Sequence, residues 1–122
     1  MSLDEIRQIQ KLQAIDAKVK AHEQAHQAAG GAFAGAPNYL TVRGPDGKEY
    51  AIAGEVPIKI VKGNTPEETI KNMQQIKAAA LAPADPSPQD LRIAQIADMI
   101  ILKATMEKNQ EKDKTHKIDL YA

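Results

Sequence analysis

The sequence predicts an α+β fold, with a long N-terminal helix, a small antiparallel sheet and two C-terminal helices. Residues 4–29 contain neither Pro nor Gly and are rich in helix-forming side chains. Two β-rich runs then flank the turn sequence GPDG at 44–47, and two helix-start signals follow, TPEE at 65–68 and SPQD at 87–90. A chain of 122 residues with no Cys is expected to form one domain with a modest core and no disulfides.

The N-terminal helix carries an apolar stripe that leads into a pair of histidines. At 100° per residue, an arc of roughly 80° holds five positions of this helix. They are Leu12, Ile15, Val19, His22 and His26. The histidines are therefore expected to face the same interior as the apolar residues, and Gly30 and Gly31 are expected to end the helix.

The middle of the chain predicts a hairpin and a third strand. We expect strands at about 39–43, 48–53 and 56–61, because each run is rich in β-formers and the first two flank the turn. Gly54 and Pro57 predict a bulge or bend near Glu55.

The two C-terminal helices are predicted from their N-caps. Thr65 and Ser87 are the expected cap residues, each followed by Pro and, three positions after the cap, by an acidic partner. We expect the last helix to run to about Glu111, and its stretch LRIAQIADMIILKATM is apolar on most sides, which favours a central position or a contact with a partner. The predicted organisation is a single domain over 1–112 and a charged C-terminal tail over 113–122.

Charge and hydropathy exclude several classes of protein. Lys plus Arg equals Asp plus Glu at 16 each. The chain has no basic stripe interleaved with aromatic residues, so nucleic-acid binding is not expected. No apolar run approaches the ~18 residues of a membrane span, and the N-terminus does not resemble a signal peptide. We therefore expect a cytoplasmic protein without a membrane partner. The sequence does not predict an oligomeric state.

The stretch HEQAH at 22–26 has the HExxH pattern of a zinc site. Two histidines four apart on a helix are neighbours, so both imidazoles can reach one ion. Glu23 lies at the border of the same face, where it can act as general base on a water held by the metal. The alternative is a pair of hydrogen-bonded histidines with a solvated glutamate.

A catalytic zinc usually takes a third protein ligand, and the residues leave several candidates. Ala29 and Ala32 stand where a metzincin would have its Gly and third His. The candidates further along the chain are Glu49, Glu55, Glu67, Glu68 and His116. Two of these, Glu67 and Glu68, already have a role at a helix N-terminus, whereas Glu55 follows small residues that would let a helix approach its strand.

Three segments together resemble the bacterial SprA-related family of metalloproteases. They are VKAHEQAHQAAGG at 19–31, GPDGKEYAIAGEV at 44–56 and IKAAALAPADPSPQD at 76–90, and the resemblance extends over about 19–97. The family's HExxH falls on His22, Glu23 and His26, and its Gly-Glu-Val motif falls on 54–56. The resemblance implies a zinc hydrolase with Glu55 as third ligand, without naming a substrate.

The resulting prediction is a minimal zincin-like metallopeptidase acting on a peptide or protein. Zinc is expected on His22, His26 and Glu55, with Glu23 as the base. An extended substrate could pair with a strand edge near the site. Possible oxyanion donors are Tyr39 and Tyr50. The alternatives are a non-catalytic zinc scaffold that binds partner helices, and a metal hydrolase acting on a non-peptide bond.

Overall fold

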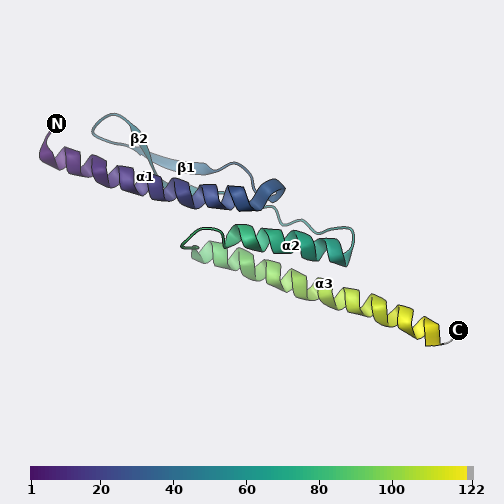
Figure 1. The fold of residues 1–122 in the computed structure, drawn as a ribbon. Helices are drawn as coiled ribbons and strands as arrows, with labels where there is room; N and C mark the ends of the chain where they lie inside the picture. Colours follow the sequence, from purple (N-terminus) through teal and green to yellow (C-terminus); the bar gives the residue numbers. More distant parts are fainter. Residues whose placement is uncertain (121–122) are drawn as a thin grey trace.

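The computed structural model describes the backbone of residues 1–120 and the side chains of residues 1–111. Its elements are α1 (Leu3–Gly30), a 3₁₀ turn η1 (Gly31–Phe33), β1 (Asn38–Arg43), β2 (Glu49–Glu55), α2 (Pro66–Ala80) and α3 (Pro88–Leu120). The predicted α+β fold is confirmed, with its long first helix, its antiparallel hairpin and its two C-terminal helices (Figure 1).

Helix α1 begins at a complete capping box and ends at glycine. Ser2 Oγ accepts a hydrogen bond from the Glu5 backbone N–H, and Glu5 Oε1 accepts one from the Ser2 backbone N–H, both at 3.1 Å. Gly31 ends the helix with φ 53°, a conformation that disfavours a side chain. The predicted apolar stripe is half-buried along its length and becomes fully buried at His26.

The hairpin contains a β-bulge that shifts the face of β2. Leu40 pairs with Ala53 while Thr41 pairs with Ala51, so Ile52 is the extra residue on β2. The bulge predicted near Glu55 therefore occurs three residues earlier. Before the bulge β2 buries Tyr50 and Ala51, whereas after it Glu55 is exposed.

The predicted third strand at 56–61 does not form. Pro57 has no backbone N–H to donate to a ladder. The segment instead makes a single bridge beyond η1, in which Gly35 N–H donates to Pro57 O at 2.9 Å and Lys59 N–H donates to Phe33 O at 2.8 Å. The sheet accordingly has only its two hairpin strands in the described part of the chain.

The N-caps of α2 and α3 follow the prediction. The Thr65 hydroxyl accepts from Glu68 N–H at 3.1 Å, and the Ser87 hydroxyl accepts from Asp90 N–H at 3.1 Å. The predicted end of the last helix at Glu111 is wrong, since α3 continues to Leu120. Residues 112–120 contain no Pro or Gly to stop it. The predicted tail therefore overlaps the end of this helix.

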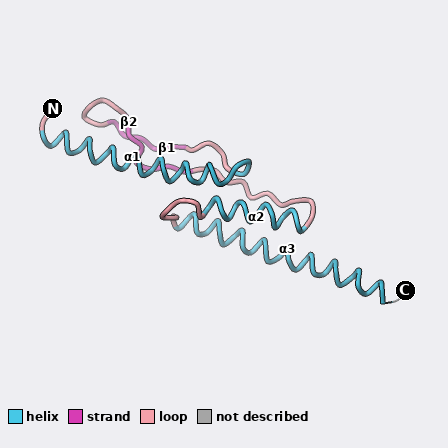
Figure 2. The backbone as a smooth tube through the Cα atoms, viewed as in Figure 1, coloured by secondary structure: helices cyan, strands magenta, loops and turns pink. Residues whose placement is uncertain are grey.

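Helix α2 lies between α1 and α3, and the hairpin lies along α1 (Figures 1 and 2). The buried core sits between the last two helices, where Met73, Ile76 and Ala97 are fully enclosed. Phe33 and Ile58 pack against this core from the bridge that follows α1. None of the helices in the described part of the chain has the length and apolarity to cross a membrane.

Candidate metal centre

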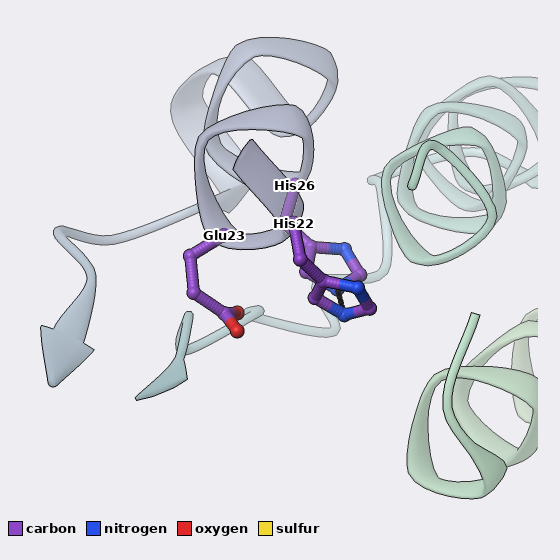
Figure 3. A group of neighbouring side chains, drawn as sticks. All are labelled: His22, Glu23 and His26. Carbon is purple, nitrogen blue, oxygen red and sulfur yellow. Dashed lines mark hydrogen bonds between the residues drawn. The ribbon is translucent and has the colours of Figure 1, made fainter. Parts of the chain in front are cut away.

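The side chains of the two histidines and the glutamate of the HExxH motif project from one side of α1 (Figure 3). One potential ligand atom from each of His22, Glu23 and His26 lies within 4.8 Å of the others. Glu23 and His26 are only 5% and 3% exposed, and His22 is half-buried. The motif therefore forms a compact, largely buried group of possible metal ligands.

The ring of His26 is oriented by the end of α2. Its Nδ1 donates to the backbone carbonyl of Ala79 at 2.8 Å, since a carbonyl can only accept. That carbonyl is in the last turn of α2, where helix carbonyls need partners from outside the helix. Gly30 lets the chain turn back against α1, because a Cβ there would be only 2.4 Å from Ala34 Cβ, while its distance to Ala79 Cβ of α2 would be 3.4 Å. In the neutral ring, Nε2 then carries a lone pair on the side of His22.

Asp90 at the start of α3 reaches both histidines. Its Oδ2 lies 3.1 Å from His22 Nε2 and 3.1 Å from His26 Nε2, and the two Nε2 atoms are 3.2 Å apart. The same oxygen accepts a hydrogen bond from the Ser87 backbone N–H at 2.9 Å. The structure thus brings a third potential ligand to the histidines from an element far along the chain.

The electrostatics of Asp90 favour its ionised form. Burial by itself raises the pKa of this carboxyl group, but the hydrogen bond from the Ser87 N–H and the neighbouring His26 and His22 rings outweigh it, so the pKa is lower than usual. Sequence reasoning gave Asp90 a capping role only. The cap signal SPQD is local, whereas the contact with His22 spans 68 positions that no spacing rule connects.

Glu23 is buried, and no residue of the described part of the chain hydrogen-bonds its carboxylate. It packs against Gly54 of β2, where an added Cβ would be 2.8 Å from Glu23 Cγ. Its carboxylate lies beside the two imidazoles (Figure 3). This position leaves the carboxylate oxygens available to a water or a substrate.

A cavity of about 330 Å³ opens over this group. Its walls come from α1, from the end of β2 with the segment that follows it, and from the start of α3. The lining residues are His22, Glu23, His26, Gly54, Glu55, Val56, Pro57, Ile58, Ser87, Gln89, Asp90 and Ile93. The volume is at the small end for ligand sites, enough for a side chain or a short peptide segment.

Of the remaining predicted site residues, Glu55 lines this cavity, whereas Tyr39 and Tyr50 do not. Glu55 lines it but is exposed, and its carboxylate does not belong to the compact His-Glu-His group. Tyr39 is half-buried opposite Gly54 and lines a neighbouring hollow with Glu55. Tyr50 does not line the cavity, because its hydroxyl donates to Asp46 in the hairpin turn. An oxyanion role for Tyr50 is therefore not supported.

The other candidate ligands lie elsewhere. Glu49 is exposed at the start of β2, and Glu67 and Glu68 are exposed in the first turn of α2. Glu68 Oε2 there accepts a hydrogen bond from the Asn64 N–H at 3.1 Å. The side chain of His116 lies outside the described residues.

Comparison with known proteins gives a family. No curated protein and no solved structure matches the chain. The profile of the SprA-related family matches residues 2–117, which includes the HEQAH helix, the Gly54–Val56 motif and the start of α3. The match covers nearly the whole sequence, and the chain therefore belongs to the SprA-related family.

Proposed function

We propose that this protein is a zinc-dependent hydrolase that cleaves peptide bonds. The observation that carries the proposal is the side-by-side placement of two imidazoles and a buried, unpaired carboxylate in one cavity. An HExxH helix supplies the same chemistry in zinc proteases, with the histidines as ligands and the glutamate as base.

The histidine donors fit a zinc ion. His26 has one nitrogen committed to the Ala79 carbonyl, which leaves its Nε2 as a donor 3.2 Å from His22 Nε2. Two imidazoles and a carboxylate are a usual donor set for catalytic zinc. A bound zinc ion supplies Lewis-acid chemistry, which lowers the pKa of a water in the site and polarises a carbonyl. Glu55 and Asp90 are the carboxylates on the cavity wall that can complete this set.

Glu23 is suited to act as the general base. The residue is only 5% exposed, and its carboxylate, which lines the cavity, has no hydrogen-bond partner among the described residues, so it is free to accept a proton. Glu23 would take a proton from a water in the cavity and return it to the leaving amine. Its distance from the imidazole nitrogens allows a water between them, because the three ligand atoms span up to 4.8 Å.

The extended segment at 54–58 supports a peptide as the substrate. This segment forms one wall of the cavity. Its pairing with β1 ends at Glu55, and its next backbone contact is the bridge between Ile58 and Ala34. Extended backbone beside a site is a common docking surface for an extended peptide.

A scaffold with a non-catalytic zinc ion is the second candidate, and the outer face of α3 favours it. Met99, Leu102 and Met106 are 70%, 64% and 56% exposed, and their spacing places them along one side of the helix. A partner helix could cover such a face. The scaffold alternative predicts a fourth protein ligand and no hydrolysis, and a metal hydrolase acting on a non-peptide bond predicts hydrolysis of other substrates only.

The test is cleavage of a mixed peptide library by zinc-loaded wild type and by Glu23→Gln, read by mass spectrometry. Glutamine keeps the shape of Glu23 and cannot accept the proton, so we expect unchanged zinc content and a loss of about 10²–10⁴-fold in rate. Metal-free protein is the control for background cleavage. If zinc-loaded wild type cleaves no peptide, the hydrolase proposal is wrong and the scaffold takes its place.

A further inference from the structure

We infer that Asp90, at the start of α3, is the third protein ligand of the metal site. The inference rests on the metal site of the proposed function, but it does not depend on hydrolysis. It differs from the expectation, implied by the Gly-Glu-Val motif, that Glu55 fills this role.

The mutual distances of three atoms carry the inference. Asp90 Oδ2 is 3.1 Å from each histidine Nε2, and the Nε2 atoms are 3.2 Å apart. Bonds of about 2.0–2.1 Å to zinc place tetrahedral donors about 3.3–3.4 Å from one another. The three atoms therefore already form a triangle close to one face of a zinc tetrahedron, and the fourth position remains for a water or substrate.

The hydrogen-bonding capacity of these atoms points to a cation at their centre. The Nδ1 of His26 donates to Ala79 O, so the neutral ring presents a lone pair at Nε2. The ionised carboxylate of Asp90 can only accept. When both rings are neutral, the one proton that His22 can place at Nε2 serves only one of these contacts, and the lone pairs of His26 Nε2 and Asp90 Oδ2 still face each other at 3.1 Å. A metal ion accepts all three lone pairs at once.

The ligand oxygen is held in place by the cap of α3. Asp90 Oδ2 accepts from the Ser87 backbone N–H at 2.9 Å, and the Asp90 backbone N–H donates to Ser87 Oγ at 3.1 Å. Such contacts to a ligand carboxylate fix its orientation and strengthen a metal site. Glu23 is an independent sign of a ligand at this place, because the residue is only 5% exposed and its carboxylate, which opens onto the cavity, has no hydrogen-bond partner among the described residues.

Glu55 lacks these properties. It is exposed after the bulge at Ile52, and among the described residues its carboxylate makes no hydrogen bond or ion pair with either histidine, whereas Asp90 contacts both. Since it lines the same cavity, it provides a matched carboxylate for comparison.

A ligand at position 90 has a structural consequence. The histidines belong to α1 and Asp90 to α3, while α2 packs between these helices (Figure 1). The metal would therefore connect the first helix directly to the start of the last. Zinc binding is expected to reduce amide exchange at 87–91 as well as on α1.

The experiment measures zinc affinity by competition with a chromophoric chelator, for the whole chain and four variants. Asp90→Ala removes the ligand, and Asp90→Asn keeps its shape and an oxygen for the Ser87 N–H. Ser87→Ala keeps the carboxylate and the backbone N–H but removes the hydroxyl cap, so it controls for damage to the helix start. Glu55→Ala controls for loss of a negative charge at the cavity. Helix content by circular dichroism checks folding of each variant.

We expect Asp90→Ala and Asp90→Asn to weaken zinc binding by about 100-fold or more, since a charged ligand is lost. Ser87→Ala keeps the backbone N–H that holds Oδ2 and loses only the hydroxyl contact, so we expect a loss of about 10-fold, the low end of the effects of residues that orient ligands. Glu55→Ala should stay within about threefold of wild type. Cobalt in place of zinc should show an altered visible spectrum only in the Asp90 variants.

Zinc affinity that falls for Glu55→Ala and is retained in both Asp90 variants would overturn the inference, as would a wild type that binds no zinc. The outcome is separate from that of the proposed function. Wild type that binds zinc through Asp90 but cleaves no peptide leaves the ligand assignment standing and removes the hydrolase. If wild type cleaves peptides and Asp90→Asn keeps full zinc affinity, the hydrolase proposal stands and the assignment of Asp90 as a ligand is overturned.

Discussion

Gly54 of β2 lies directly against Glu23 of α1. A Cβ at position 54 would be 2.8 Å from Glu23 Cγ and 3.2 Å from Glu23 Oε2, closer than side chains normally approach. The glycine of the Gly-Glu-Val motif therefore makes room for the proposed base. Its role is one of space, because its backbone does not have the positive φ that is found at Gly31 and Gly47.

Replacing this glycine should displace the base without removing the metal. In Gly54→Ala the methyl group must push Glu23 aside, and a shift of about 1 Å at a catalytic group can cost about 10²-fold in rate. We expect peptide cleavage to fall by at least about tenfold. Zinc affinity should be unchanged, because the atoms nearest to an added Cβ at position 54 belong to Glu23 and Tyr39 and not to a histidine. Rates and zinc affinity measured on the same preparation check this.

Gly35→Ala is the matched control. A Cβ at position 35 would be 3.5 Å from Pro57 Cγ, an ordinary contact, so rate and zinc affinity should both stay near wild type. Equal activity of Gly54→Ala and wild type would show that Glu23 does not need its present position.

Tyr39 should act through its ring rather than its hydroxyl. The ring packs over Gly54, since a Cβ there would be 3.0 Å from Tyr39 Cδ1, and the residue does not line the main cavity. Tyr39→Phe should keep activity within about threefold, below the 10²–10³-fold loss typical of a removed oxyanion donor. Tyr39→Ala should reduce activity more, because it uncovers the backbone behind Glu23. A large loss in Tyr39→Phe would instead support the oxyanion role predicted from the sequence.

Local signals in the sequence predicted most of the fold. The caps at Ser87 and Thr65 and the turn at 44–47 are short-range features, and each occurs where expected. The HExxH spacing likewise brought His22 and His26 together because they are one turn apart on a helix.

The sequence-based predictions that were wrong or incomplete concern features that depend on tertiary packing. The bulge at Ile52 changes which residues of β2 face α1, and nothing in the spacing of the strand fixes its position. Ala51 donates its N–H to Asp16 Oδ1 of α1 at 2.8 Å, a contact between distant segments that accompanies the bulge. Asp90 was missed for the same reason, because its position against the histidines follows from how α2 and α3 pack.

The hydrogen bond from Tyr50 to Asp46 predicts a pH-dependent contribution to stability. This bond lowers the pKa of Asp46 and raises the pKa of Tyr50, in each case as the largest cause. A lowered carboxyl pKa stabilises the fold above the unfolded value of about 3.9, and that contribution is lost as the pH falls through the folded pKa. A raised phenol pKa stabilises below the unfolded value of about 10 and is lost as the pH rises through the folded pKa.

Tyr50→Phe should therefore destabilise the fold only between these limits. We expect a lower denaturation midpoint than wild type near pH 7, and a difference that shrinks as the pH falls below about 4. Urea unfolding at several pH values measures this, and Asp46→Asn with and without Tyr50→Phe tests whether the effect belongs to the pair. A difference between wild type and Tyr50→Phe that is constant from pH 7 to pH 3 would show that the hydroxyl contributes independently of the charge on Asp46.

Removing zinc should lower the thermal stability of the whole domain. A ligand that binds only the folded state stabilises it by about 4 kcal/mol when present at a thousandfold excess over its dissociation constant. For a chain of this size that corresponds to roughly 10–20 °C in melting temperature. The proposed ligands come from α1 and from the start of α3 and meet only in the folded chain, so the unfolded chain should not hold the ion. Melts with zinc and with chelator measure it, while magnesium, which prefers oxygen ligands, should give no shift. His26→Ala should melt at one temperature in both conditions, and identical melts of wild type would show that no metal is bound by the folded state.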